Sequence, residues 1–277
     1  MEFFAPAKVN LSLRVLRRRE DGFHEIETLM APVAIRDTLR IERRNAGGIE
    51  FTCSDTTLPT DGTNLVVRAA RGFFDATRFE PNARIFLQKE TPHGAGLGGG
   101  SSDAATTLLA LDTIFETHLP LSELTRIAAA IGSDIPFFLV RSPAWCRGRG
   151  EIVEPSTRPH ALPLLLIKPP FGVPTPWAYQ RWRDSLEIPG VSYGPQMLGD
   201  ITFVNDLERP VFEKFIQLAE MKRWLLEQPE TAAALISGSG STMIGVLRSK
   251  SQGQVLAEKA RTQFGEHTWL ALTETAS

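Results

Sequence analysis

The chain has 277 residues, 42% of them hydrophobic, and a formal net charge of −2 at pH 7. This length and apolar content predict one large or two modest domains with real cores, and the nearly neutral charge gives no sign of a surface that binds nucleic acid or a membrane. We expect a cytoplasmic protein, because the two cysteines, Cys53 and Cys146, fit neither a metal spacing nor a disulfide framework, and neither a signal-peptide pattern nor a bilayer-spanning apolar run is present.

Strands are predicted for much of the first fifty residues. Residues 9–15 alternate apolar and polar side chains with a period of two, and residues 26–35 and 38–42 continue the pattern. Asp-Gly at residues 21–22 is a turn signal, so Phe23 and His24 are expected just beyond a hairpin connection. Taken alone, these two residues fit a core aromatic beside a surface histidine.

A helix is predicted over residues 64–78, which place apolar side chains on one helical face with Asn64 as a possible N-cap. Residues 83–87 are predicted to form a strand. That strand leads into a glycine-rich loop, which a helix over residues 101–117 follows.

The glycine-rich loop is the strongest local signal in the chain. Glycine permits positive φ and close approach to a ligand, and the free N–H groups at the start of the following helix attract phosphate. The loop satisfies the G-x-G-x-x-G pattern of dinucleotide-binding folds. Those folds also need an acidic residue on a second strand about 20 residues further on, but here the region near Glu116 is the end of a helix. The lysine of a P-loop is also missing before Ser101 and Ser102. The loop therefore predicts a phosphate site of another type.

Asp134 follows a helix predicted over residues 122–131 and a stop at Gly132. Pro136 predicts an extended approach to an apolar strand, which would place Asp134 at a rigid loop-to-strand junction. By itself, an aspartate in such a position is more often a turn-former than a catalyst. Residues 147–152 are predicted to form a turn between short strands that closes the first domain.

The second half begins with a predicted boundary at residues 155–163, which contain three prolines. Thr175 is expected to cap a helix that starts at Pro176. The other predicted elements are a strand at 162–168, a helix opening at 205–208, a tight Ser/Gly turn to a strand or a helix at 236–245, a helix at 252–264 and a strand at 268–272.

Together these segments resemble the GHMP kinases, small-molecule kinases named for galactose, homoserine, mevalonate and phosphomevalonate. The matching segments are 5–11 (Ala-Pro-Ala-Lys-Val-Asn-Leu), 21–24 (Asp-Gly-Phe-His), 92–105 (Pro-His-Gly-Ala-Gly-Leu-Gly-Gly-Gly-Ser-Ser-Asp-Ala-Ala), 132–136 (Gly-Ser-Asp-Ile-Pro), 174–176 (Pro-Thr-Pro), 205–208 and 236–245. Asp-Gly-Phe-His together with Pro-Thr-Pro favours the branch that acts on a cytidine diphosphate conjugate of methylerythritol.

The resemblance implies an α+β, two-domain GHMP kinase fold. The N-terminal domain, residues 1–155, would be ribosomal-protein-S5-domain-2-like, the C-terminal domain, residues 156–277, ferredoxin-like, and the active site would lie in the cleft between them. The implied reaction is ATP-dependent phosphorylation of the substrate's 2-hydroxyl with Mg²⁺ on the phosphates, in the non-mevalonate route to isopentenyl diphosphate. Another GHMP-family kinase activity, or a nucleotide-binding relative without catalysis, remains an alternative, and no oligomeric state is predicted.

The resemblance also implies roles for individual residues. Asp134 would be the catalytic base and Lys8 would hold it ionised. The implied ATP-binding residues are Asn64, Lys89, Pro92, His93, Gly94, Ala95, Gly96, Leu97, Gly98, Gly99, Gly100, Ser101 and Ser102. The implied substrate-binding residues are Asn10, Phe23, His24, Thr175 and Tyr179.

Three questions about the site residues stay open. N-capping explains Asn64 at least as well as a ligand does. Ser102 and Asp103 are both candidates for Mg²⁺, although the helix dipole explains an aspartate in the first turn equally well. The family usually has tyrosine where this chain has Phe23, so the aromatic face remains and the hydroxyl is lost.

Overall fold

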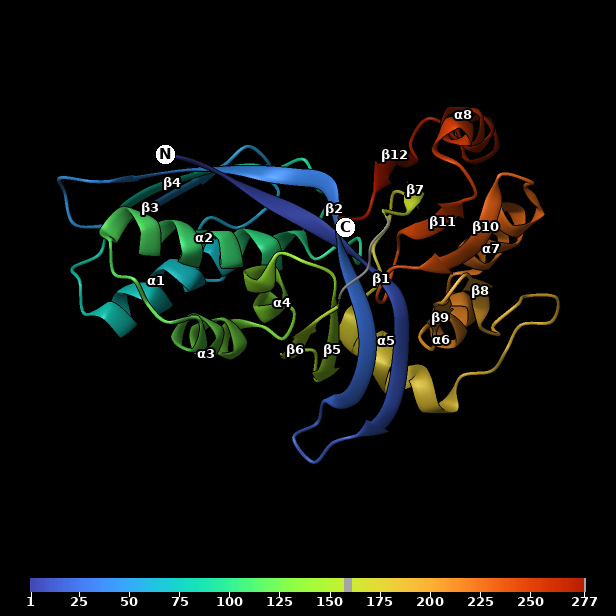
Figure 1. The fold of residues 1–277 in the computed structure, drawn as a ribbon, viewed down its shortest axis with the longest axis horizontal. Coiled ribbons are helices and arrows are strands. Elements are labelled where there is room, and N and C mark those ends of the chain that lie inside the picture. Colours follow the sequence, from blue (N-terminus) through green and yellow to red (C-terminus); the bar gives the residue numbers. More distant parts are fainter. Residues whose placement is uncertain (157–160, 277) are drawn as a thin grey trace.

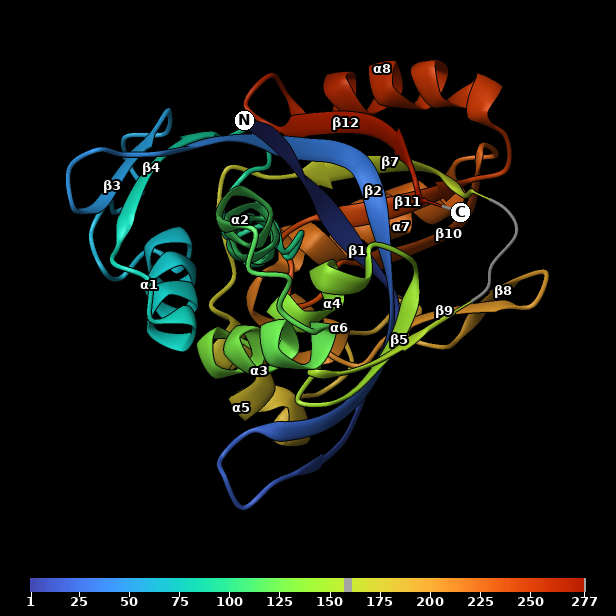
Figure 2. The ribbon, with the colours of Figure 1, turned by 60° about the vertical axis from the view of Figure 1, so that its left-hand side comes forward.

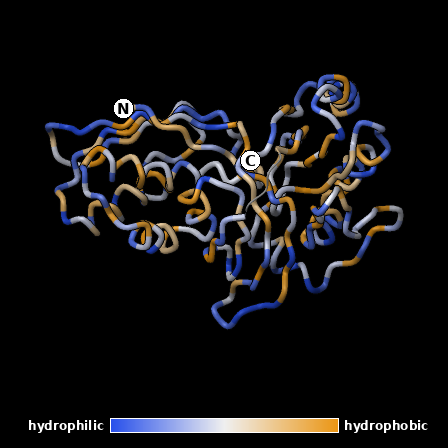
Figure 3. The backbone as a smooth tube through the Cα atoms, viewed as in Figure 1, coloured by the Kyte–Doolittle hydropathy of each residue, from blue (hydrophilic) through white to orange (hydrophobic). Residues whose placement is uncertain are grey.

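A long antiparallel ribbon of β1 (Glu2–Arg18) and β2 (His24–Arg43) runs through the computed structural model, which describes residues 1–156 and 161–276 (Figure 1). The predicted strands at 26–35 and 38–42 are parts of β2, a single strand. The turn between β1 and β2 lies at a free end of the ribbon and is hydrophilic (Figure 3), as the turn signal predicted.

The larger sheet contains this ribbon. Its strands lie in the order β3 (Gly48–Cys53), β4 (Asn82–Gln88), β2, β1, β9 (Ile201–Asn205) and β8 (Gln196–Leu198), while β5 (Ala144–Gly148) pairs with β2 and β6 (Ile152–Pro155) pairs with β5. β9 pairs with β1 in parallel at Ser12 and Leu13. Strands from the second half of the chain therefore extend a sheet of the first half, and the boundary at residue 155 stays a prediction.

Helices cover one face of this sheet (Figure 2). They are α1 (Leu65–Thr77), α2 (Gly99–Phe115), α3 (Leu121–Ile131) and α4 (Ile135–Val140). α2 is buried along most of its length among the other helices and the sheet, which its small alanine side chains permit. This central position directs the N-terminus of α2 toward the middle of the molecule.

The second sheet has the strand order β10 (Thr231–Ile236), β11 (Met243–Leu247), β7 (Pro163–Lys168) and β12 (Trp269–Glu274). Leu164 and Leu166 of β7 pack in one cluster with apolar residues of β1, whereas Leu165 and Ile167 pack in another with α7 (Ile216–Glu227) and α8 (Gly253–Phe264). Successive side chains of a strand point to opposite faces, so β7 is apolar from Leu164 to Ile167 because both faces are covered.

The other elements are α5 (Thr175–Arg181), α6 (Glu208–Lys214) and the 3₁₀ helices η1 (Trp182–Asp184) and η2 (Lys250–Gln252). Among the described residues, no helix has both the length and the apolar character needed to cross a bilayer.

One predicted strand is wrong. The residues after Asp134 form helix α4, with Pro136 as its second residue. Proline is tolerated there because the N–H groups of a first helical turn have no partner within the helix. β3, β8, β9 and α7 are not among the predicted elements, and part of the predicted linker, residues 157–160, lies outside the described residues.

Candidate active site

A cavity of about 880 Å³ lies where the glycine-rich loop meets β1, α5 and the loop between β10 and β11. Every predicted catalytic, ATP-binding and substrate-binding residue lines this cavity except Ser102. Ser102 is fully buried and its hydroxyl has no hydrogen-bond partner.

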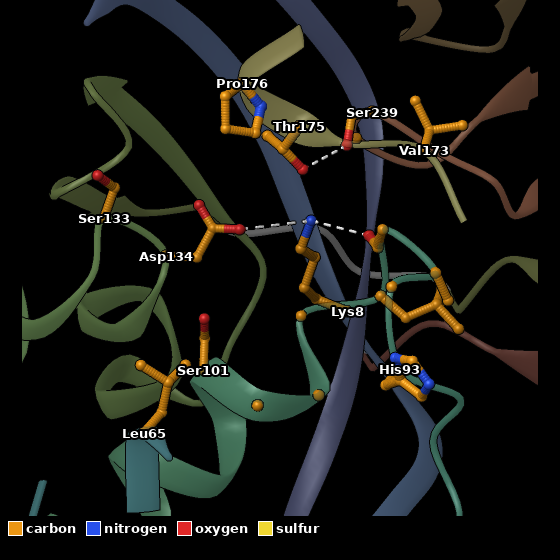
Figure 4. Close-up of a pocket in the computed structure, with 18 of the residues that line it drawn as sticks. Lys8, Leu65, His93, Ser101, Ser133, Asp134, Val173, Thr175, Pro176 and Ser239 are labelled. Carbon is orange, nitrogen blue, oxygen red and sulfur yellow. Dashed lines mark hydrogen bonds and ion pairs between the residues drawn. The ribbon is translucent and has the colours of Figure 1, made fainter. Parts of the chain in front are cut away.

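Lys8 and Asp134 point toward each other across this cavity (Figure 4). The Nζ atom of Lys8 lies 3.6 Å from Oδ2 of Asp134, and it donates hydrogen bonds to Oδ1 of Asn10 at 2.7 Å and to the carbonyl of Gly96 at 3.0 Å. The Lys8 side chain is only 4% exposed, whereas that of Asp134 is 36% exposed. The ammonium group is thus fixed by the protein, while the carboxylate faces the open space.

Asn10, a predicted substrate residue, has a second function. Its Nδ2 donates to Oγ1 of Thr28 at 2.8 Å while its Oδ1 accepts from Lys8. The amide therefore connects Lys8 to the neighbouring strand β2 and fixes the direction in which the ammonium points.

Asp134 occupies the N-cap position of α4, but its side chain makes no capping hydrogen bond. The carboxylate is therefore available to a ligand. Gly150 passes close by, and a Cβ atom added to it would lie 3.4 Å from Oδ1 of Asp134. The turn between β5 and β6 is thus packed against the catalytic candidate.

The glycine-rich loop changes into α2 at Gly98, which has a φ of 67° and is the N-cap of the helix. A Cβ atom on Gly98 would lie within 3.0 Å of Lys8 and Phe138. The loop is fastened to β1 by a hydrogen bond from the Lys8 backbone N–H to the carbonyl of Leu97, at 2.9 Å. The first turn of α2 therefore faces the same cavity as Lys8, as an anion site requires.

The Ser/Gly segment between β10 and β11 is a strand-to-strand turn that completes the cavity wall. The hydroxyl of Ser237 donates to the carbonyl of Gly96 at 2.9 Å, and a Cβ atom on Gly96 would overlap the carbonyl oxygen of Ser237. Gly96 thus permits close packing of this turn against the glycine-rich loop.

The capping role predicted for Thr175 is wrong. Helix α5 begins at Thr175 itself and its N-cap is Pro174, so Thr175 already has helical backbone geometry and cannot cap. Its hydroxyl instead lies 2.7 Å from that of Ser239 (Figure 4). Thr175 therefore joins α5 to the Ser/Gly turn at the cavity wall.

Lys89 is buried between two carboxylates, with Nζ 2.6 Å from Oδ2 of Asp37 and 2.8 Å from Oδ2 of Asp103. Asp37 also accepts the backbone N–H groups of Glu90 and Thr91, which begin the loop. Burial raises the pKa of Asp103 to about 8, Lys89 opposes the rise and Asp37 adds to it. This cluster braces the loop, and the ATP contact predicted for Lys89 stays a prediction.

Asn64 caps α1, since its side chain accepts the N–H of Val66 at 2.9 Å. The capping interpretation is therefore confirmed. Asn64 also lines the cavity, so its contact with ATP stays a prediction.

Aromatic side chains line the end of the cavity beyond Asp134. The rings of His24 and Tyr179 have centroids 5.4 Å apart, and the Arg149 guanidinium lies 4.8 Å from the centre of the Phe23 ring. Burial raises the pKa of the Tyr179 phenol and the charge of Asp134 adds to this rise, while burial and Arg18 lower the pKa of His24. A neutral histidine among aromatic faces suits a flat heterocyclic ligand.

Some cavity residues are not among the predicted ones. They include Leu58, Pro59, Thr63, Leu65, Ser133, Arg149, Val173 and Gln180. The Arg-Gly-Arg-Gly-Glu pattern at 147–151 marked the turn of Arg149, but only the pairing of β5 with β2, in which Gly148 faces Ile26, places that turn near Phe23.

Known proteins match this chain over its whole length. Residues 64–142 match the N-terminal domain of GHMP kinases. The chain is 41% identical, over 98% of its length and 95% of the other protein, to a 4-diphosphocytidyl-2-C-methyl-D-erythritol kinase from Methylacidiphilum infernorum (isolate V4). A crystal structure of a 4-(cytidine 5'-diphospho)-2C-methyl-D-erythritol kinase superimposes with a TM-score of 0.81 at 36% identity, covering 100% of both chains.

A homoserine kinase from Cytophaga hutchinsonii has the same fold, with a TM-score of 0.67 at 18% identity over 100% of this chain and 94% of the other. The predicted α+β GHMP kinase fold is confirmed by these similarities.

Proposed function

The chain belongs to the 4-diphosphocytidyl-2-C-methyl-D-erythritol kinase family of the GHMP kinases, and we propose from this premise that it transfers the γ-phosphoryl group of ATP to the 2-hydroxyl of 4-diphosphocytidyl-2-C-methyl-D-erythritol. The products are ADP and the 2-phosphate, in the non-mevalonate route to isopentenyl diphosphate. The compartment that we propose is the cytoplasm.

The position of the Lys8–Asp134 pair carries this proposal. Lys8 contacts the glycine-rich loop through the carbonyl of Gly96, and Asp134 lies on the side of the aromatic residues. A phosphoryl donor held by the loop and an alcohol held among the aromatics would therefore meet at this pair.

Catalysis of phosphoryl transfer depends mainly on positioning the nucleophile and on neutralising charge on the transferring group. In the mechanism we propose, backbone N–H groups at the start of α2 bind the β- and γ-phosphates. Asp134 accepts a hydrogen bond from the 2-hydroxyl, orients its oxygen toward phosphorus and takes the proton late in the transfer. Lys8, 3.6 Å from the Asp134 carboxylate, stabilises negative charge on the same oxygen.

Mg²⁺ would supply charge neutralisation on the phosphates when it is bound with ATP. Among the described residues, no group of three or more His, Cys, Asp or Glu side chains could hold a metal, but Oδ1 of Asp103 is buried without a hydrogen-bond partner and Asp103 lines the cavity. This fits an ion carried largely by nucleotide phosphates, with at most one or two protein carboxylates. We propose Asp103 as its protein contact in preference to Ser102, which does not line the cavity.

A coupled assay for ADP with a panel of alcohols tests the proposed function. ADP release that depends on 4-diphosphocytidyl-2-C-methyl-D-erythritol supports it. Release that depends instead on homoserine, mevalonate or galactose would indicate another GHMP kinase activity. ATP binding without release of ADP for any of these alcohols would indicate a non-catalytic relative.

A further inference from the structure

The turn at residues 148–151, which connects β5 to β6, is built around the carboxylate of Glu151. This carboxylate accepts the backbone N–H of Arg149 at 2.6 Å and lies 3.6 Å from the Arg149 Nε. Gly148 has a φ of 73°, and a Cβ atom on it would lie 2.8 Å from Oε2 of Glu151. The turn is thus a defined structure that presents the Arg149 side chain in one direction.

That direction is into the active-site cavity. Arg149 is one of its lining residues, and its guanidinium lies over the ring of Phe23. The next residue, Gly150, is packed against Asp134. Arg149 therefore lies between the aromatic end of the cavity and the carboxylate that would receive the substrate's hydroxyl.

Of the cationic side chains that line this cavity, Arg149 is the one held least tightly by protein groups of opposite charge. Three of the described lining residues are lysine or arginine: Lys8, Lys89 and Arg149. Lys8 is directed by Asn10, Gly96 and Asp134, and Lys89 is buried between two aspartates. Among the described residues, Arg149 forms an ion pair with one carboxylate, that of Glu151, at a distance longer than a hydrogen bond; it also attracts the carboxylate of Asp21 electrostatically, and its side chain is 27% exposed.

We propose that Arg149 binds the diphosphate of the cytidine substrate, a role that rests on the proposed function. The diphosphate joins the base to the alcohol, so it must lie between the aromatic residues and Asp134, where Arg149 is. A guanidinium forms paired hydrogen bonds to phosphate oxygens, and the face of Phe23 keeps it extended over the cavity before the substrate arrives. Glu151 orients the guanidinium but, at 3.6 Å, makes no hydrogen bond to it.

Calorimetric binding of CDP and of cytidine to the full-length protein tests this role, because the two ligands differ by the diphosphate. Arg149→Gln should weaken CDP binding at least about tenfold, the usual scale for a lost charge-assisted hydrogen bond, and leave cytidine binding within about twofold. Arg147→Gln is the matched control. Arg147 belongs to the same turn region, pairs with Glu27 and Glu154 and does not line the cavity, so both affinities should be unchanged.

Two results would overturn the role of Arg149. One is equal weakening of CDP and cytidine in Arg149→Gln, which would place the guanidinium against the base or in the fold. The other is CDP binding equal to that of the wild-type protein. If Arg149→Gln does not fold, Arg149→Lys is measured instead. Lysine keeps the positive charge but cannot form the paired hydrogen bonds of a guanidinium, so CDP binding should again weaken while cytidine binding stays within about twofold. Wild-type protein that binds neither CDP nor cytidine would overturn the proposed function itself.

Discussion

The Nζ atom of Lys8 and the Oδ2 atom of Asp134 lie 3.6 Å apart, although the two residues are 126 positions apart in the chain. The distance is longer than a hydrogen bond and short enough for a strong electrostatic interaction in a partly buried site. A substrate oxygen that approaches both groups would have a proton acceptor, Asp134, on one side and a positive charge, that of Lys8, on the other.

We expect Asp134→Asn and Lys8→Met each to lower kcat at least about a hundredfold, the scale found for acid–base and electrostatic groups. Methionine is chosen because it fills the buried volume of the lysine stem without the charge. ATP affinity, measured by calorimetry, should change little in either variant. Turnover close to that of the wild-type protein would remove the substituted residue from the mechanism.

Gly98→Ala should lower ATP affinity and kcat together. The added methyl group must lie within 3.0 Å of Lys8 and Phe138, at a φ of 67° that disfavours a side chain, so both the loop and Lys8 have to shift. Gly100→Ala is a useful comparison, because its methyl group would meet only Leu65, at 3.5 Å. Steady-state kinetics with ATP varied should show the smaller effect for Gly100→Ala, and the opposite order would contradict this account of the loop.

Tyr179→Ala should raise KM for the cytidine substrate about ten- to a hundredfold and leave KM for ATP nearly unchanged. A stacking contact with a base contributes about 1–3 kcal/mol, which corresponds to that range. Tyr179→Phe keeps the ring and should be nearly neutral. If Tyr179 is only a core aromatic, Tyr179→Ala will instead lower Tm and leave the affinity for the cytidine substrate intact.

Stability should depend on pH through Asp103. Burial raises its pKa to about 8 in the folded state, so the folded protein keeps a proton that the unfolded chain loses above about pH 4. The free energy of unfolding therefore falls as pH rises from about 4 to about 8, by at most about 1.4 kcal/mol per pH unit. Asp103→Asn should remove this contribution. Urea unfolding of both proteins between about pH 5 and 8 measures it, and parallel pH profiles would show that Asp103 does not titrate in this range.

Contiguous sequence patterns predicted the loop and the helix that line the cavity. The glycine-rich loop and the start of α2 are adjacent in the chain, so local backbone preferences indicated the glycines of positive φ and the helix that follows them, while phosphate binding there stays a prediction. Lys8 and Asp134 came from the family resemblance, and the structure brings them together. Local signals also predicted the cap at Asn64 and the strand-to-strand option for the turn after β10.

Pairings between distant segments could not be predicted from local patterns. Asp37 meets Lys89 because Thr38 pairs with Gln88 when β2 pairs with β4, and nothing near Asp37 in the sequence indicates that register. Arg149 likewise reaches Phe23 only because β5 pairs with β2. Helix α4 was missed because a proline early in a short apolar run fits a first helical turn as well as the approach to a strand.

The carbon spectrum of the product made from ATP and 4-diphosphocytidyl-2-C-methyl-D-erythritol distinguishes phosphoryl transfer to the 2-hydroxyl from transfer to any other hydroxyl. We expect ADP and a product in which a newly attached phosphorus splits the resonance of carbon 2 of the methylerythritol unit. A product with the new phosphoryl group on another hydroxyl, or recovery of unchanged substrate from folded, ATP-binding protein, would contradict it.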